Sequence, residues 1–307
     1  MQRHSFFPAL LICLFAVLSS CHETPSQKIS LEKREQIKTE LKNGKPVRIA
    51  VGGMITPREG FAYYRQFLDY IGEKLGRPVE FVDREDYAEI NKLVAGEQVE
   101  VAFVCGGPYV DGNKEFGMEL LAAPVAYGGT VYYSYIIVHK NSAFERFSDL
   151  RGKRFAFTDP LSNTGKLVPT YMLAKMNETP DSFFGKYGYL GSHDKAIQAV
   201  ADGVVDGAAV DSLIWEYANR TSPKFTSKTR IILKSPPYGI PPVVVPKHID
   251  PLLKERIRRI FLEAHTDSKG SEILKKMHIE RFVTIEDKAY DSIREMKTWL
   301  DKQKKMK

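Results

Sequence analysis

The chain has few cysteines, few long apolar runs and none of the motifs that mark common enzyme classes. Its 307 residues include three cysteines, so the fold must rest on a hydrophobic core rather than on disulfides. Beyond residue 18, no segment is apolar enough to be a membrane span. There is no Gly-x-Ser-x-Gly elbow, no His-Glu-x-x-His, no P-loop and no cysteine–histidine metal spacing. The sequence therefore predicts a protein that is not an enzyme and that uses neither a cofactor nor a metal.

The first twenty residues have the pattern of a secretory signal. The initial Met-Gln-Arg-His carries positive charge, and the apolar segment over residues 6–18 is too short to span a bilayer well. Residues 18–21, Leu-Ser-Ser-Cys, resemble the lipobox that is cut and acylated during bacterial lipoprotein maturation. We predict a signal peptide over residues 1–20, lipidation of Cys21, and export to a membrane face toward the periplasm or the cell exterior. The alternative is an ordinary secretory signal with a cysteine there by chance.

The placement of the cysteines and the net charge further narrow the kinds of protein and ligand that the sequence allows. With Cys13 removed in the signal and Cys21 lipidated, only Cys105 remains, and the mature chain forms no internal disulfide. The formal net charge of +7 favours anionic ligands or anionic membrane surfaces, although charge speaks to steering rather than to identity. Lysines and arginines are spread along the chain, which argues against nucleic-acid binding. Residues 21–44 are polar, without apolar periodicity, and are predicted to form a tether.

The remaining sequence alternates between strand and helix patterns. In its first part, strands are expected at 47–51, 79–82 and 99–104, and helices at 57–75 and 86–95. A second series has strands at 154–157 and 207–210 and helices at 164–175 and 194–202. Such alternation predicts an α/β protein with parallel sheets and helical crossovers.

Two long extended segments indicate that the chain crosses between two lobes. Residues 130–138 are aromatic and β-branched, and the prolines over residues 236–242 interrupt a second extended stretch before the strand pattern at 243–245. We therefore predict two lobes joined by a hinge of two crossing segments, with a ligand cleft between them. Lobe 1 is assigned to residues 45–133 and 243–307, and lobe 2 to residues 134–242. The helical segments that follow residue 250 are expected to pack on lobe 1.

The most informative segment is residues 157–169, which follows a predicted strand. Ser162 stands at an N-cap position, and the helix after it directs unsatisfied N–H groups at the turn. Hydroxyl groups add donors and Gly165 allows close approach, so the turn is suited to an oxyanion. The alternative is that Ser162 and Thr164 only cap the helix.

The run Asp159-Pro160 with Ser162-Asn163-Thr164-Gly165 resembles the signature of the phosphate, phosphite and phosphonate periplasmic binding proteins of ABC transporters. Residues 191–196 and 203–212 resemble the family's later motif in order and spacing, and residues 99–109 resemble its strand, turn and tyrosine segment. The similarity extends from about Lys45 to the C-terminus. It implies the two-lobed type II periplasmic-binding-protein fold.

The resemblance also implies a set of ligand contacts. These are Tyr109, Ser162, Asn163, Thr164, Gly165, His193 and Asp211. Hydroxyls and a histidine N–H donate to anionic oxygens, whereas the carboxylate of Asp211 only accepts, which favours a ligand that keeps a proton or carries an amine and disfavours sulfate. Without the resemblance, His193 is equally well explained as a helix-capping residue, and Asp211 as the N-cap of the next helix.

Lobe 1 contacts are expected from the turn and helix after the first strand. Thr56 or Tyr63 is predicted to reach the cleft, although Thr56 fits an N-cap equally well, and Tyr64 has the spacing of a helix core residue. The sequence departs from the family at two places. Cys105-Gly106-Gly107-Pro108 stands where relatives have Gly-Pro, which bears on the orientation of Tyr109. Asn163 replaces a hydroxyl residue, which bears on the size and polarity of the ligand.

These patterns together predict a solute-binding lipoprotein. It would capture a small phosphonate, phosphite or phosphate by closing its two lobes and deliver the ligand to an ABC permease, acting as a monomer. The alternative is a ligand-sensing lipoprotein that uses the same cleft to signal to a membrane partner.

Overall fold

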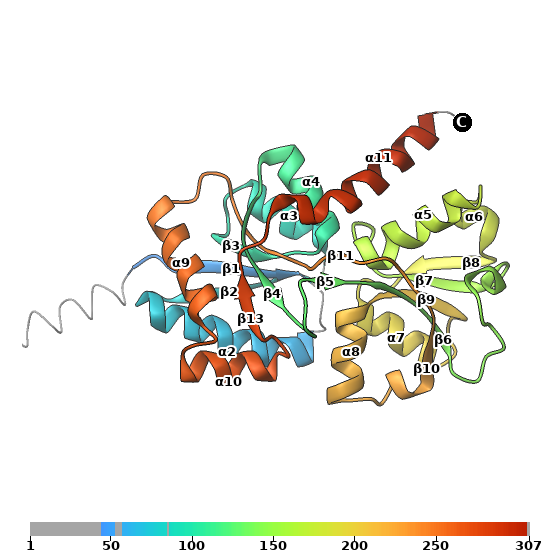
Figure 1. The fold of residues 1–307 in the computed structure, drawn as a ribbon, viewed down its shortest axis with the longest axis horizontal. Coiled ribbons are helices and arrows are strands. Elements are labelled where there is room, and N and C mark those ends of the chain that lie inside the picture. The colour runs from blue at the N-terminus through green and yellow to red at the C-terminus, as the bar shows by residue number, and fades with distance from the viewer. Residues whose placement is uncertain (1–43, 53–56, 85, 306–307) are drawn as a thin grey trace, which may run out of the picture.

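The computed structural model describes residues 44–52, 57–84 and 86–305. Within them, a six-stranded and a five-stranded sheet are joined by a two-stranded ribbon. Figure 1 shows the two sheets side by side, each with its own helices. We call the part built on the six-stranded sheet lobe 1 and the part built on the five-stranded sheet lobe 2. The predicted signal peptide and nearly all of the predicted tether lie outside the described residues.

Lobe 1 has a mixed sheet in the order β13-β4-β12-β3-β1-β2. Its strands are β1 (Val47–Gly52), β2 (Val79–Arg84), β3 (Val101–Phe103), β4 (Glu119–Val125), β12 (Val243–Val245) and β13 (Arg281–Val283). Its helices are α2 (Pro57–Leu75), α3 (Tyr87–Ala95), α4 (Gly106–Phe116), α9 (Pro251–Glu263) and α10 (Ser268–Lys276). β1 pairs in parallel with β2 and β3, so the carboxyl ends of these three strands meet at one edge.

The core of lobe 1 joins the two ends of the chain. Phe67, Leu68 and Ile71 recur at helical spacing on α2, and each is at most 1% exposed. The ring of Phe67 stacks on Phe282 of β13 and meets Phe261 of α9 edge to face. The C-terminal segment therefore completes a core that the N-terminal strand and helix begin.

Lobe 2 has a sheet in the order β10-β6-β9-β7-β8. Its strands are β6 (Ser134–His139), β7 (Arg154–Phe157), β8 (Lys186–Tyr189), β9 (Gly207–Asp211) and β10 (Thr229–Lys234). Its helices are α5 (Val168–Lys175), α6 (Pro180–Phe183), α7 (His193–Ala201) and α8 (Ser212–Thr221), with short helical turns η1 (Phe147–Leu150), η2 (Asn163–Leu167) and η3 (Thr226–Lys228). A cluster of phenylalanines fills its core, with Phe155 stacked on Phe184 at 4.2 Å.

The two lobes are connected through the two-stranded ribbon. The chain leaves lobe 1 through β5 (Val131–Tyr132) and returns through β11 (Tyr238–Gly239), and these two strands pair antiparallel. Tyr132 and Tyr238 face each other in this pairing and are both buried. Because both crossings are short and lie side by side, they have the arrangement of a hinge.

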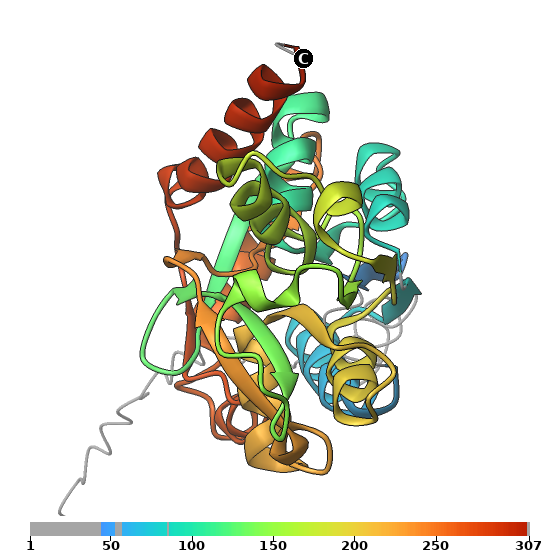
Figure 2. The ribbon, with the colours of Figure 1, turned by 90° about the vertical axis from the view of Figure 1, so that its right-hand side faces the viewer.

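The last helix reaches from lobe 1 to lobe 2, whereas the sequence suggested that it would pack on lobe 1. After the turn η4 (Asp287–Tyr290), helix α11 (Asp291–Lys305) starts on lobe 1, where Lys297 forms an ion pair with Asp111 of α4. It then runs over α5 of lobe 2, as Figures 1 and 2 show. There Trp299 meets Tyr171 edge to face at 5.1 Å, and Lys175 lies over the indole. We expected the last helices to pack on lobe 1, as α9 and α10 do, but the aromatic residue on α11 finds its partner on lobe 2.

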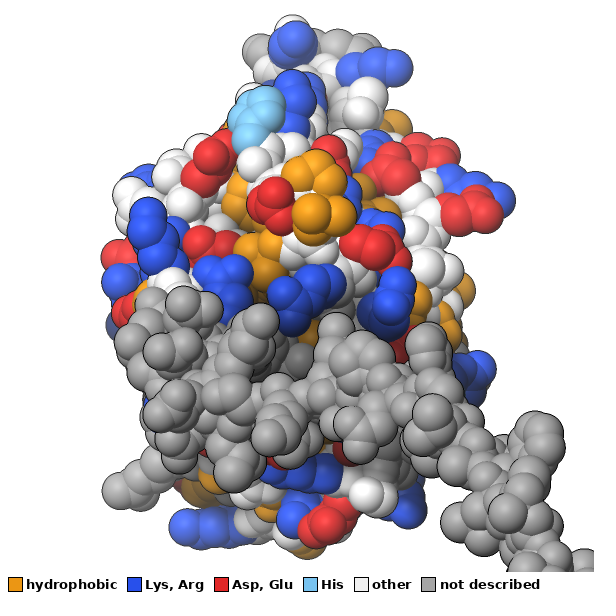
Figure 3. Space-filling view, turned by 90° about the vertical axis from the view of Figure 1, so that its left-hand side faces the viewer, with side chains coloured by type: hydrophobic (Ala, Val, Ile, Leu, Met, Phe, Trp, Pro, Cys, Tyr) orange, Lys and Arg blue, Asp and Glu red, His pale blue; other side chains and the backbone are white. Residues whose placement is uncertain are grey.

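The outer end of lobe 1 carries charges of both signs. Where described side chains are visible in Figure 3, basic and acidic groups intermingle over this face. None of the helices in the described part of the chain combines the length and the apolar character that a membrane span requires.

Candidate ligand-binding site

A largely buried turn after β7 forms the centre of the candidate site. We call its residues, Thr158 to Gly165, the cradle. Ser162 is the N-cap of η2, and its Oγ accepts a hydrogen bond from the Gly165 N–H at 3.0 Å, so the capping role predicted from sequence is real. A Cβ on Gly165 would lie 1.8 Å from Thr158 Oγ1, and only glycine fits there. Ser162, Asn163 and Thr164 are all fully buried.

Several polar atoms around the cradle are buried and find no hydrogen-bond partner among the described residues. They are Thr158 Oγ1, Asn163 Oδ1, Thr164 Oγ1, Ser192 Oγ and His193 Nε2. A buried polar group without a partner costs about 1–3 kcal/mol, so five such groups around one turn are expensive. Unpaired polar groups that gather in this way mark a site built to hold a polar ligand rather than to stabilise the fold.

The hydrogen bond to His193 defines which of its ring nitrogens is the donor. His193 Nδ1 accepts from the backbone N–H of Asp211 at 2.9 Å, so in the neutral ring the proton is on Nε2. Burial lowers the pKa of His193 to about 3, so the ring stays neutral at physiological pH. His193 therefore offers one N–H donor, and that donor is the nitrogen without a partner among the described residues.

Asp211 ends β9 and caps α8. Its Oδ1 accepts from the Leu213 N–H at 2.7 Å, which confirms the N-cap interpretation without excluding a ligand role for the other oxygen. Burial raises the pKa of Asp211 to about 7, against the effect of hydrogen bonds from backbone N–H groups of α8. The carboxyl group is 1% exposed, so around neutral pH it is divided between its acid and carboxylate forms.

Lobe 1 closes over the cradle through the start of α4. A Cβ on Gly107 would lie 2.3 Å from the Leu161 carbonyl oxygen, so the backbones of the two lobes touch here. Asn163 Nδ2 donates to Tyr132 Oη at 3.1 Å, and Tyr87 N–H donates to the Asp159 carboxylate at 3.2 Å. The N-terminus of α4 adds partial positive charge beside the cradle, because the first N–H groups of a helix have no intrahelical partner and form the positive end of its dipole.

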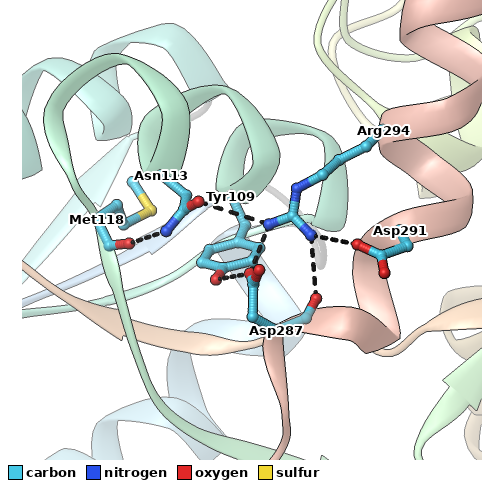
Figure 4. Close-up of polar contacts among 6 residues, drawn as sticks. All are labelled: Tyr109, Asn113, Met118, Asp287, Asp291 and Arg294. Carbon is cyan, nitrogen blue, oxygen red and sulfur yellow. Dashed lines mark hydrogen bonds and ion pairs between the residues drawn. The ribbon is translucent and has the colours of Figure 1, made fainter.

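The hydroxyl of Tyr109 has its hydrogen-bond partner on the C-terminal segment and not in the cradle. Its hydroxyl donates to Asp287, whose carboxylate also pairs with Arg294 of α11, and Figure 4 shows these groups converging beneath α4. The Tyr109 ring also meets Tyr290 at 4.7 Å. Tyr109 thus joins α4 to the C-terminal segment, and the structure does not bring its hydroxyl together with the other predicted contacts. The ligand role predicted for Tyr109 stays a prediction.

The other predicted residues have separate positions. Thr56 and Cys21 lie outside the described residues, so their roles stay predictions. Tyr63 is half-buried and meets Tyr217 of α8 at 6.4 Å, so it does reach across to lobe 2. Tyr64 is buried against Phe103, as expected of a core residue.

Sequence reasoning missed Tyr132, whereas Cys105 is a buried residue of a hydrophobic cluster. Tyr132 lies in the first crossing, where the aromatic run was explained only by its strand pattern. The Cys105 sulfur lies 3.5 Å from Tyr132 Oη, and burial raises the pKa of its thiol. The sequence did offer a signal for Tyr132, because this tyrosine lies in the first predicted crossing segment, between two of the motifs expected at the cleft. Among the described residues, no group of three or more metal-ligating side chains converges.

Comparison with known proteins places the chain in a family. Residues 50–290 match the family described as "ABC transporter, phosphonate, periplasmic substrate-binding protein". The chain is 28% identical over 183 residues to the probable ABC transporter phosphite binding protein PhnD1 of Prochlorococcus marinus, which covers 56% of this chain and 62% of that protein. It is 27% identical over 216 residues to the phosphonates-binding periplasmic protein of Escherichia coli. This match covers 69% of the present chain and 64% of that protein. The chain thus spans less than two thirds of the length of these relatives.

Solved structures confirm the predicted type II periplasmic-binding-protein fold. A binding protein component of an ABC phosphonate transporter from Pseudomonas aeruginosa has a TM-score of 0.78 at 23% identity, covering 83% of this chain and 86% of that one. PhnD1 of P. marinus in complex with methylphosphonate has a TM-score of 0.77 at 21% identity, covering 85% and 100%. The family consists of exported binding proteins of transporters and not of enzymes. Since the family match covers more than half of the chain, the protein belongs to the phosphonate periplasmic substrate-binding protein family of ABC transporters.

Proposed function

We propose that this protein is the lipid-anchored, solute-binding component of an ABC transporter and that its cleft captures a small phosphonate, phosphite or phosphate. The observation that carries the proposal is the set of buried, unpaired donors around the cradle, with Thr164 Oγ1 and His193 Nε2–H among them. Donors fixed in place and removed from water are what a compact oxyanion requires. The proposed ligand contacts are Ser162, Asn163, Thr164, Gly165, His193 and Asp211.

The chemistry of the site favours phosphorus oxyanions over sulfate. At least one acceptor, the Asp211 carboxylate, lies beside the donors, and it bonds well to a ligand that keeps a proton or carries an amine. Phosphate and phosphonates keep a proton near neutral pH, whereas sulfate does not. Relatives are named for phosphite, phosphonates and phosphate, which agrees with this chemistry.

Anchoring and delivery complete the proposal. Acylation of Cys21 would hold the mature protein at the membrane, with the following residues as a tether, and a permease would receive the ligand from the closed form. The test of anchoring is mass spectrometry of the protein from membranes. A diacylated or triacylated Cys21 at the new N-terminus supports the proposal, and an unmodified N-terminus contradicts it.

Ligand capture is tested by removing one donor hydroxyl without changing its shape. Thr164→Val should weaken binding of methylphosphonate or phosphite about ten-fold or more, because hydrogen bonds to a charged group contribute about 1.5–3 kcal/mol. Thr226→Val is the matched control. Thr226 is also buried with an unpaired Oγ1, but it lies in η3, outside the cradle. Equal affinities of the two variants, measured by isothermal titration calorimetry, would contradict the proposal.

A further inference from the structure

Helix α11 connects the two lobes outside the ribbon. Its first half is fixed to lobe 1, where Lys297 Nζ lies 2.8 Å from a carboxylate oxygen of Asp111 on α4. Ile293 and Met296 on the same helix are buried, and a Cβ on Gly106 at the start of α4 would lie 2.6 Å from Ile293 Cδ1. The first half of α11 is thus packed tightly on α4 and belongs to lobe 1.

The second half of α11 lies on lobe 2. The indole of Trp299 meets the ring of Tyr171 on α5 edge to face, with the ring centroids 5.1 Å apart. Lys175 Nζ lies 4.9 Å from the centroid of the indole. Aromatic pairs in this geometry, and a cation over an indole, attract each other. Trp299 therefore joins a helix of lobe 1 to a helix of lobe 2.

The part of lobe 2 that α11 contacts begins in the cradle. η2 and α5 follow each other without a break, so Tyr171 stands six residues after Gly165 of the cradle, and α11 contacts both of these helical segments. Val168, where α5 starts, belongs to the same buried cluster as Met296 of α11 and Tyr238 of the ribbon. Tyr238 Oη lies 3.5 Å from Met296 Sδ. The last helix, the ribbon and the helix that starts in the cradle therefore meet in one apolar cluster.

The contact at Trp299 is coupled to closure of the lobes. In this structure the lobes touch at the cradle, where the start of α4 lies against the Leu161 carbonyl. A rotation about the ribbon that separates α4 from the cradle also displaces α5 relative to α11, because α11 is packed on α4 and α5 continues from the cradle. The contact between Trp299 and Tyr171 is therefore a contact of the closed arrangement.

We propose that Trp299 is a positioning residue for ligand capture, which docks on Tyr171 when the lobes close and stabilises the closed form without touching the ligand. This inference rests on the proposed function and adds to it a residue outside the cradle. A contact made only in the closed form raises ligand affinity by the factor by which it stabilises that form. A purely structural contact would instead stabilise the protein equally with and without ligand.

The first test removes the indole. The ligand is methylphosphonate, phosphite or phosphate, whichever binds the unaltered protein most tightly by calorimetry. Trp299→Ala should bind it about five- to ten-fold more weakly, through faster dissociation in stopped-flow measurements, while thermal unfolding of the ligand-free protein changes little. Trp299→Phe keeps an aromatic ring against Tyr171 and should restore most of the affinity. Thr298→Ala, at an exposed position of the same helix, is the matched control.

The second test uses Trp299 as its own reporter. The chain has two tryptophans, and the other one, Trp215, lies in lobe 2 against Tyr135. In Trp215→Phe the tryptophan emission comes from Trp299 alone, and we expect ligand to shift this emission to shorter wavelength as the indole docks on lobe 2. Calorimetry on the same samples shows whether ligand is bound.

The outcomes separate this inference from the proposed function. If ligand binds but Trp299→Ala binds it as tightly as the unaltered protein does, Trp299 is only a structural contact and the inference is overturned, while the cradle proposal stands. Emission from Trp299 that does not respond to bound ligand overturns the inference too. If none of the three ligands binds the unaltered protein, both proposals are overturned.

Discussion

The cradle and the lobe 1 residues that meet it lie against each other but are built in opposite ways. The cradle is a run of adjacent residues, Thr158 to Gly165, and its donors are fixed by one strand end and one helix start. The lobe 1 side collects Tyr87 of α3, Gly107 of α4 and Tyr132 of β5, which come from separate elements. The cradle is therefore determined locally, whereas its contacts with lobe 1 exist only when the two lobes are in place. Substitutions should consequently separate oxyanion binding from closure of the lobes.

The largest effect is expected from adding a methyl group in the cradle. Gly165→Ala places a Cβ 1.8 Å from Thr158 Oγ1, in the buried part of the turn, so the cradle must change shape. We expect phosphonate affinity to fall by about 100-fold or more. Gly188→Ala in β8 is the control, since a Cβ there meets nothing within 4 Å. Calorimetry with both variants measures the difference, and unchanged affinity in Gly165→Ala would show that the cradle is not the site.

A methyl group on the lobe 1 side should act on closure instead. Gly107→Ala places a Cβ 2.3 Å from the Leu161 carbonyl oxygen of lobe 2. We expect the lobes to close less completely and the affinity to fall about ten-fold, with little change in the thermal unfolding of the free protein. Small-angle scattering with and without ligand measures closure. A variant that closes on ligand like the unaltered protein would show that this contact is not needed.

Asp211→Asn should change how stability depends on pH. The pKa of His193 is lowered to about 3 in the folded protein, so as pH falls the unfolded chain takes up this proton before the folded chain does. His193 therefore lowers the stability of the fold as pH falls below about 6.5. Asp211 has a raised pKa of about 7, so the folded state binds the proton first, and Asp211 makes stability fall as pH rises between about 4 and 7. The two effects oppose each other in this window.

Removing the carboxyl should therefore expose the histidine effect, and asparagine is an equally good N-cap. We expect Asp211→Asn to lose roughly 2–3 kcal/mol of stability, relative to the unaltered protein, between pH 6.5 and pH 4. Denaturant unfolding across this range measures it, with the exposed Asp202→Asn as control. Parallel pH profiles for all three proteins would show that Asp211 and His193 are not buried as described.

The smallest effect is expected at Tyr109. Tyr109→Phe removes the hydroxyl that donates to Asp287, and we expect a loss of about 1–2 kcal/mol in unfolding free energy with affinity unchanged within about two-fold. A large loss of affinity without loss of stability would instead support the ligand contact implied by the family resemblance.

Local patterns predicted local structure well. The alternation of strands and helices gave the α/β fold, and Ser162 and Asp211 cap helices where their positions in the sequence indicated. What the sequence did not reveal depends on distant packing. The orientation of Tyr109 is decided by Asp287 and Arg294 near the C-terminus, and the path of α11 is decided by the contact between Trp299 and Tyr171. The lobe 1 residues that meet the cradle could not be predicted either, since Tyr87, Gly107 and Tyr132 come from three different elements.

The most direct test of the account is a calorimetric titration of the mature protein with methylphosphonate, phosphite, phosphate and sulfate at about pH 7, where the Asp211 carboxyl is partly ionised and phosphorus oxyanions still carry a proton. The account predicts tight binding of at least one phosphorus oxyanion and much weaker binding of sulfate, because the carboxylate repels a ligand that has no proton to share. Tight binding of sulfate, or binding of none of the four, would contradict the assignment of the cradle as a site for phosphorus oxyanions.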